Sequence, residues 1–427
     1  METLSLRLYE TPALRLPVKL ALAAVMLAIV AFIYAPVTTL DFSNPDDDWM
    51  LIKYELVHPA QFSMAYLYEV FTSFNDIQYS PLNTLYYYAL YSINGYDPYY
   101  FHLGSLIVHM INILLVHLVV KRVMEDFELA QAGISAAIIT FIWAVHPLNV
   151  ESVAWISASK VVLFTMFTLL STYCLMRGMD GKAGWLAGSL AFLVMACCCK
   201  EQAIIVPVTG LLYAGCLRLH RGLPLWKMNG VIYGLALQLI VSVTFGLIAR
   251  KANVVLNTQL VPIIQYDALQ RVLLSFYCLS FYLTNAFVPL NLHYFYHFPV
   301  SPHAAFPFTY YLYAVGLTML SAVGIFLLRK SHWRYYMLFC AGYFFLHLVL
   351  VLHIIPMMRS SIVADRYMYL PLLAMLLAIV PFCVRMLERR GNIWRLAVAV
   401  GLSAYLTLLC LYSHQLVQNW SKLNLAS

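Results

Sequence analysis

The chain has 427 residues, 63% of them hydrophobic and 11% charged, with a formal net charge of +7. Soluble proteins carry about a quarter charged residues, so this composition excludes a soluble enzyme or binding protein and indicates a membrane protein. The positive excess is expected at the cytoplasmic ends of membrane spans and does not indicate a nucleic-acid partner. The nine cysteines all lie in apolar stretches, where we expect packing residues rather than disulfides or zinc ligands.

Eleven apolar runs approach the length of about 20 residues that a membrane span requires. They lie at 18–37, 102–120, 131–146, 152–176, 183–198, 202–217, 229–249, 308–328, 335–355, 367–384 and 394–413. We therefore predict an all-α polytopic membrane protein with about eleven transmembrane helices, arranged as a single domain over residues 1–427. The first run lacks a small-residue cleavage site, so we expect it to be retained as a span.

The basic residues predict the orientation of these spans. Arg7, Arg15 and Lys19 precede or open the first span, which predicts a cytoplasmic N-terminus. The later basic clusters face the same side if the polar, proline-containing segment 271–291 lies in the interface and does not cross the membrane. The face opposite to these basic residues, on which we expect the active site, would then be periplasmic in a bacterial inner membrane, or lumenal in the endoplasmic reticulum of a eukaryote.

This topology leaves two long segments outside the cytoplasm. The first, 38–101, combines acidic residues with many tyrosines, and aromatic side chains favour the headgroup level of a membrane. We predict that this first extracytoplasmic loop forms amphipathic helices on the membrane surface. The second, 250–307, is predicted to be an outer loop or an interfacial segment, and shorter outer turns are expected at 146–151, near 199–201 and at 356–366.

Three consecutive aspartates, Asp46, Asp47 and Asp48, follow the first span. Adjacent carboxylates repel one another, so a cation, a metal or a proton must accompany them if they are buried. One of them could then act on a substrate while its neighbour binds the backbone or a metal. The alternative is a solvated loop in which Asp48 caps a helix, and the sequence alone leaves both interpretations open. The sequence requires no cofactor, and a divalent metal is compatible with the cluster.

Ionisable residues also occur where spans begin or end. Glu151 and Lys160 follow the His146-Pro147 pair, at a spacing that does not make them neighbours on one helix face. Each is expected to have a partner elsewhere or a function, because charges are costly at that depth. A Glu151–Lys160 ion pair is the alternative.

Two further islands of charge precede later spans. Lys200 and Glu201 lie between two apolar runs, and adjacent side chains on a helix do not face each other. Arg359 and Arg366 precede the tenth span, where a guanidinium offers a planar pair of donors suited to phosphate. The alternative for the Asp365-Arg366 pair is a helix cap.

His102 and His109 lie on one face of the second span. We favour a hydrogen-bonded core role over metal binding, because neither histidine belongs to a motif with metal-ligand spacing.

The chain carries these motifs in an order that resembles the GT-C superfamily of lipid-phosphosugar-dependent glycosyltransferases. The resemblance is to the protein O-mannosyltransferase-like branch in particular, which often carries C-terminal tetratricopeptide repeats. The sequence stops at Ser427 without such repeats, which puts acceptor recognition through repeats in doubt. The resemblance covers nearly the whole chain, through Asp46-Asp47-Asp48, Tyr79-Ser-Pro-Leu82, Phe101-His-Leu103 with His109 and Asn112, His146-Pro-Leu-Asn-Val-Glu-Ser-Val-Ala-Trp155, Lys200-Glu201, and Ala364-Asp-Arg-Tyr-Met-Tyr-Leu-Pro371.

The resemblance implies a membrane enzyme that passes a sugar from a polyprenyl-phosphate carrier to an acceptor hydroxyl, on a protein or a glycan, at the outer face. The acidic pair of the family falls on Asp46 and Asp47, or one residue later on Asp48, with one carboxylate as general base. The candidate ligands of the donor phosphate are Lys160, Lys200, Arg359 and Arg366. The candidate substrate-binding residues are His102, His146, Glu151, Glu201 and Tyr367.

Two other functions fit a polytopic membrane protein. A transporter, or a lipid or glycan flippase, could line a pathway with Glu151 and Lys160. The ionisable residues are expected at one face rather than at the midplane, where transporters bind their substrates. A non-catalytic scaffold is the third class, and the retained acidic cluster opposes it. We therefore favour the glycosyltransferase interpretation.

Overall fold

The computed structural model describes residues 16–42, 45–75, 78–182, 184–225, 229–252, 266–290, 292–302, 304–354, 361–388 and 390–420. Over these ranges the regular structure is helical, and the only other pairing is an isolated antiparallel bridge between Asn75 and Gln78. Together with the length and apolarity of the helices, this confirms the prediction of an all-α polytopic membrane protein.

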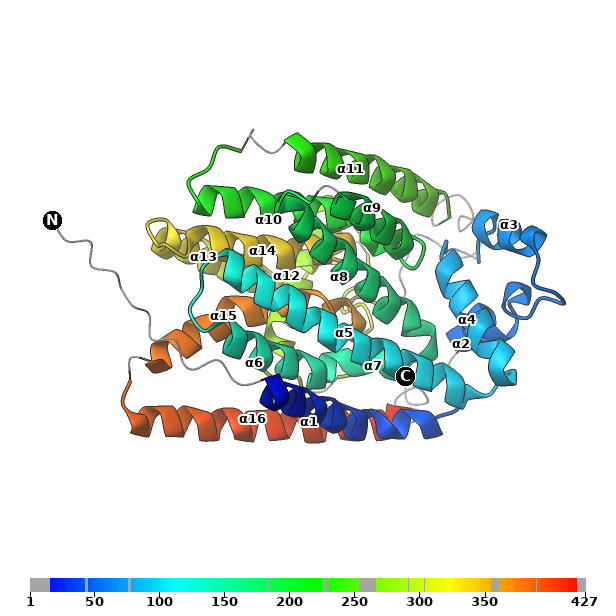
Figure 1. Cartoon of the computed structure of the whole chain (residues 1–427), viewed down its shortest axis with the longest axis horizontal. Helices are drawn as coiled ribbons and strands as arrows, with labels where there is room; N and C mark the ends of the chain where they lie inside the picture. Colours follow the sequence, from blue (N-terminus) through cyan, green and yellow to red (C-terminus); the bar gives the residue numbers. More distant parts are fainter. Residues whose placement is uncertain are drawn as a thin grey trace.

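Twelve of the helices in the described part of the chain form the body of the molecule, and Figure 1 shows most of them running side by side between two ends. They are α1 (Leu16–Tyr34), α5 (Pro98–Asp126), α6 (Ala132–Val145), α8 (Ser159–Met179), α9 (Gly184–Cys197), α10 (Val206–His220), α11 (Asn229–Arg250), α12 (Ala268–Asn285), α13 (Phe308–Leu328), α14 (Arg334–Leu348), α15 (Pro371–Glu388) and α16 (Asn392–Gln418).

Nine helical segments of the described residues are long and apolar enough to cross a membrane, and a bent pair gives a tenth. The bent pair joins α6 to the residues Pro147–Ala154 at an angle of 58°. Pro147 explains the break, because proline lacks the N–H that would continue the helix and restricts the residue before it. The predicted span 183–198 corresponds to α9, whose 14 residues are too few for a full span. The predicted interfacial segment 271–291 falls mainly on α12, which is not among the spanning helices.

Burial separates central helices from peripheral ones. The most apolar windows of the segments that contain α5 and α8 are 56% and 67% buried, whereas that of α13 is 0% buried. In a membrane the exposed apolar side chains of α13 face lipid, because acyl chains replace the protein contacts that a soluble helix would need. The centre of the bundle is therefore built on α5 and α8, and residues that pack against these two helices are shielded from lipid.

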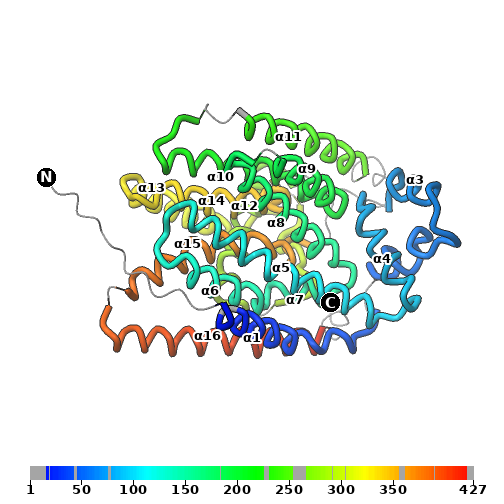
Figure 2. Tube along the Cα trace, in the orientation of Figure 1, coloured from blue at the N-terminus to red at the C-terminus, as the bar shows by residue number. Residues whose placement is uncertain are grey.

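Four short helices complete the architecture: α2 (Pro45–Asp47), α3 (Met64–Thr72), α4 (Pro81–Asn94) and α7 (Val150–Ala154). Figure 2 shows α3 and α4 together beyond one end of the bundle, next to the start of α5, and Figure 1 shows α2 beside α4. We call this end the α4 end. The predicted loop 38–101 thus contains helices, as expected, and Ser63 caps the first turn of α3 by accepting from the Tyr66 N–H at 3.1 Å.

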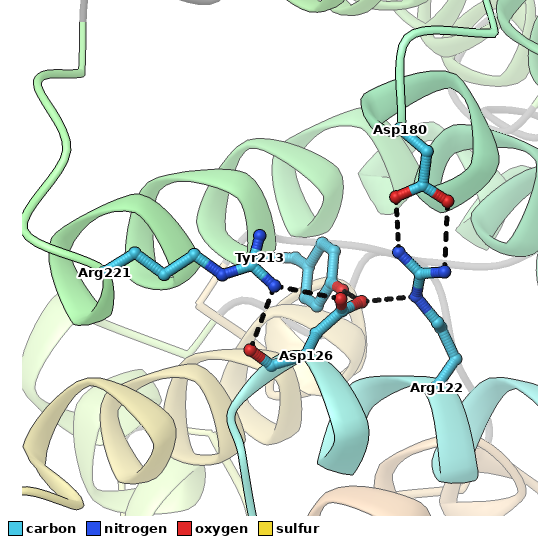
Figure 3. A network of polar contacts seen from close by, with 5 residues as sticks. All are labelled: Arg122, Asp126, Asp180, Tyr213 and Arg221. Atoms are coloured by element: carbon cyan, nitrogen blue, oxygen red, sulfur yellow. Dashed lines mark hydrogen bonds and ion pairs between the residues drawn. The ribbon is translucent and has the colours of Figure 1, made fainter.

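At the opposite end, a buried carboxylate links three parts of the chain (Figure 3). Asp126 accepts hydrogen bonds from Arg122 Nε at 2.7 Å, from Arg221 Nη2 at 3.1 Å, and from the Tyr213 hydroxyl. Arg122 also forms a bidentate pair with Asp180, at 3.0 and 2.6 Å. The network ties α5 to α10 and to the turn after α8, so the helices are fixed at this end by charge-assisted hydrogen bonds.

Candidate functional site

The three consecutive aspartates have three different environments. Asp47 is buried and accepts two hydrogen bonds from Ser157, from the backbone N–H at 3.0 Å and from the hydroxyl at 2.5 Å. Asp46 is partly exposed and accepts from the Trp49 indole at 2.9 Å. Asp48 pairs with Lys53 and keeps 45% of its side chain exposed. The solvated-loop interpretation therefore describes Asp48, whereas Asp47 anchors the segment to the bundle.

Lys160 lies at the start of α8, close to charged residues from several separate segments of the chain. Its ammonium donates to Gln78 Oε1 at 2.5 Å and lies 3.8 Å from Met50 Sδ. These contacts hold the ammonium between the α2–α4 segment and the bundle. The same ammonium is within electrostatic range of Asp46, which precedes Met50, and of charged side chains from two further segments of the chain, Lys200 with Glu201 and Arg366. Charged residues that are far apart in the sequence are thus close enough to one lysine at the α4 end to act on its charge.

The chain reaches Lys160 through the break at His146 and Pro147. His146 is buried, its Nδ1 accepts from the Leu148 N–H at 3.2 Å, and its Nε2 contacts the Ala286 carbonyl at 3.2 Å. The Asn149 amide donates to the Trp143 carbonyl at 2.6 Å. His146 therefore stabilises the turn through Nδ1 and links it to the end of α12 through Nε2, a role that sequence reasoning did not assign to it.

Glu151 and Arg366 form a buried ion pair. Glu151 Oε2 accepts from the Arg366 backbone N–H at 2.6 Å, and Glu151 Oε1 pairs with the Arg366 guanidinium. The expectation that Glu151 has a partner away from Lys160 is confirmed. The Arg366 guanidinium lies over the rings of Trp155 and Tyr367, at 4.8 and 5.2 Å from their centroids. Its side chain remains 19% exposed, so it is held in place while one part stays accessible.

Asp365 has a separate partner. It is buried and accepts from the Tyr296 hydroxyl at 2.8 Å. Burial, and secondly the charge of Glu151, raise the pKa of the Asp365 carboxyl well above its usual range. The N-cap of the short helix Asp365–Met368 is Ala364, and the side chains of Asp365 and Arg366 bind Tyr296 and Glu151. The two residues instead connect different segments to the site.

Lys200 and Glu201 enter the site from the turn after α9. Lys200 is buried and extended, and the 3-10 helix Glu201–Ile205 follows it directly. The turn is also fixed by α4, because the Leu82 N–H at the start of α4 donates to the Cys198 carbonyl at 3.1 Å. The extended backbone at Lys200 directs the two charged residues away from a common helix face.

The remaining predicted residues have varied positions. His102 is buried in the second turn of α5, beside Asp41. Tyr367 is half-buried against Arg366. Arg359, predicted as a phosphate ligand, lies outside the described residues.

Three residues of the site were not predicted from the sequence. Gln78 positions Lys160, Ser157 holds Asp47, and Tyr296 binds Asp365. Each is an uncharged polar residue without a recognisable spacing to its partner. Ser157 does lie between Trp155 and Lys160, so its proximity to the charged island was the one available hint.

The described residues contain no group of three or more His, Cys, Asp or Glu side chains arranged to hold a metal ion. Three buried carboxylates of the site are each bound by protein donors, Asp47 by Ser157, Glu151 by Arg366 and Asp365 by Tyr296.

No family model matches the chain. The human protein named Protein O-mannosyl-transferase TMTC3 is 27% identical to it over 132 residues, which is 30% of this chain. The matched segment is 14% of the length of the human protein. The similarity is thus to a limited part of a protein O-mannosyl-transferase.

Proposed function

We propose that the protein is a membrane glycosyltransferase of the GT-C type, which moves a sugar from a polyprenyl-phosphate-linked donor to an acceptor hydroxyl. The observation that carries this proposal is the position of Lys160, whose ammonium is held by Gln78 and Met50 at the α4 end, within electrostatic range of the Asp46 carboxylate and the Arg366 guanidinium. A base and a set of cations thus share one site at the end of a helical bundle. The partial similarity to a protein O-mannosyl-transferase supports the same class of reaction.

The chemistry assigns a role to each charged group. Asp46 is the general base, because it is partly exposed, whereas Asp47 is occupied by Ser157. It takes the proton of the acceptor hydroxyl as the oxygen attacks the anomeric carbon of the donor. The bond from that carbon to the phosphate oxygen breaks, and its electrons leave with the polyprenyl phosphate. Lys160 and Lys200, with Arg366, neutralise the charge that develops on this leaving group.

A transporter or flippase is the alternative for a bundle of this kind. The charged groups around Lys160 gather at the α4 end, whereas transporter sites lie near the bilayer midplane between broken helices. The break at Pro147 also occurs at this end, where it turns Glu151 toward Arg366. These positions favour chemistry at the membrane surface over passage through the bundle.

The orientation of the bundle forms part of the proposal. The network of Arg122 and Arg221 lies where α5 and α10 end, opposite to α4, and positive residues favour the cytoplasmic side. The α4 end would then face the periplasm of a bacterium or the lumen of the endoplasmic reticulum. A protein Ser or Thr hydroxyl is the acceptor that we favour, because the human relative is named a protein O-mannosyl-transferase.

The proposal is tested with purified protein in phospholipid vesicles that contain polyprenyl-phosphate-mannose, with a soluble Ser/Thr-rich peptide as acceptor. Wild type should add hexose mass to the peptide, detected by mass spectrometry. Asp46→Asn should reduce the rate by about 10²–10⁴-fold, the usual contribution of a general base. Asp48→Asn is the matched control, because Asp48 is an exposed neighbour paired with Lys53.

Near-normal transfer by Asp46→Asn would contradict the assignment of the base. An absence of transfer with mannose, glucose and N-acetylglucosamine donors, combined with movement of a labelled donor between leaflets, would contradict the enzyme and support a flippase.

A further inference from the structure

Helix α3 presents three distinct sectors around its axis. Tyr66 and Val70 are buried against α4 and the residues around Leu56. Met64, Tyr68 and Phe71, spaced to share one face, are 82%, 73% and 40% exposed. The remaining sector carries Ala65, Glu69 and Thr72, and it is also exposed. The helix therefore has a packed face, an exposed apolar face and an exposed polar face.

The C-terminal end of α3 is fixed to the end of a lipid-facing span. Lys251, which directly follows α11, lies over the Phe74 ring at 5.8 Å, and the rings of Tyr79 and Phe245 are 6.2 Å apart. The Tyr79 hydroxyl also donates to the Phe71 carbonyl at 2.9 Å. Figure 1 accordingly shows α3 beside the α4 end of α11. The apolar face of α3 therefore lies near the level at which α11 emerges from the membrane.

The surface of α11 shows what surrounds this region. Ile240, Val243 and Leu247 form one exposed apolar face that leads toward the end of α11 nearest α3. Only 17% of the most apolar window of α11 is buried. In a polytopic membrane protein such a face contacts acyl chains. An apolar, aromatic-containing face at the end of this surface is typical of a segment at the headgroup and acyl boundary.

We propose that the exposed apolar face of α3, formed by Met64, Tyr68 and Phe71, inserts into the bilayer surface at the α4 end. The polar face with Glu69 then points to water, and the buried face connects the membrane surface to α4. Because α4 docks on the Cys198 turn and on Ile156, this anchor fixes the α2–α4 segment relative to the bilayer. The proposal does not depend on the glycosyltransferase reaction.

The test uses nitroxide labels on single cysteines in the full chain, reconstituted into phosphatidylcholine vesicles. Cys383→Ser and Cys410→Ser remove the two cysteines that are not buried. Labels are placed at Met64→Cys, at Tyr68→Cys and, as the matched polar-face control, at Glu69→Cys. Collisions with oxygen, which concentrates in lipid, are compared with collisions with a water-soluble nickel chelate.

We expect the labels at Met64 and Tyr68 to lose nickel collisions and to gain oxygen collisions relative to the label at Glu69. Equal nickel accessibility at all three positions would overturn the proposal. Spin–spin broadening at Tyr68 that disappears on dilution with unlabelled protein would also overturn it, because a second copy of the chain would then cover the face. Far-ultraviolet circular dichroism and thermal unfolding of each labelled protein verify that the fold is retained.

Discussion

Ser157 donates both its backbone N–H and its hydroxyl to the same carboxylate oxygen of Asp47, at 3.0 and 2.5 Å. The two residues are 110 positions apart, and the contact ties the segment after α1 to the start of α8. Lys160 follows Ser157 by one helical turn. The buried aspartate therefore positions the lysine around which the site is built.

Asp47→Asn should destabilise the protein, because the amide weakens two charge-assisted hydrogen bonds in a buried position. The expected loss is about 1–3 kcal/mol, measured by thermal unfolding in detergent. Ser157→Ala should cost less, because the backbone N–H remains as a donor. Asp48→Asn serves as the exposed control and should change stability by less than about 0.5 kcal/mol. Equal stability of Asp47→Asn and Asp48→Asn would show that the Asp47 contact does not anchor the segment.

Glu151 and Arg366 should behave as a coupled pair. Arg366→Ala leaves the Glu151 carboxylate buried without its cation and should cost about 3–5 kcal/mol. The double variant Glu151→Gln/Arg366→Ala should recover part of this loss, because no isolated charge then remains. A double-mutant cycle of thermal unfolding measures the coupling, and additive single effects would contradict it. In the transfer assay, Arg366→Lys should keep the pair but weaken donor use, since lysine lacks the planar donor fork.

Lys160→Gln should raise the donor KM more than it lowers thermal stability, because the amide can keep a hydrogen bond to Gln78 while the charge is lost. A charge-assisted contact contributes about 1.5–3 kcal/mol, which corresponds to roughly 10- to 150-fold in donor use. Donor titration in vesicles is the measurement, and Lys53→Gln at the exposed Asp48 pair is the control. Unchanged donor saturation in Lys160→Gln would remove Lys160 from the phosphate site.

The raised pKa of Asp365 predicts a pH dependence of stability. The folded state holds a proton on Asp365 at pH values where the unfolded chain, with an ordinary pKa near 3.9, has released it. The stabilisation should therefore be complete at pH values below the pKa of the unfolded chain. The free energy of unfolding should then fall as pH rises toward the raised pKa, by up to about 1.4 kcal/mol per pH unit.

Asp365→Asn should flatten this dependence, because the amide oxygen still accepts from Tyr296 and no longer titrates. Thermal unfolding between pH 5 and 8 compares it with wild type, and with Glu69→Gln as a solvent-exposed control. An unchanged pH slope in Asp365→Asn would mean that Asp365 is already ionised in the folded protein.

The class of the protein and the positions of most helices follow from the composition and the apolar runs of the chain. Long apolar runs have no other stable state than membrane helices, because every backbone polar group must be satisfied within the span. The break at Pro147 follows from the missing N–H of proline, and the charged residues Glu151 and Lys160 were expected to need partners because charges are costly within a span. These conclusions depend on local composition, which the sequence displays directly.

Which side chains contact one another could be learned only from the folded chain. Asp46, Asp47 and Asp48 are equivalent in sequence, yet burial against Ser157 separates Asp47 from its neighbours. The Glu151–Arg366 pair and the contact of Gln78 with Lys160 join segments that the sequence keeps far apart. The number of full spans also depended on the folded length of α9. Long-range pairing reflects how helices pack and where turns end, and local patterns of charge and hydrophobicity do not encode either.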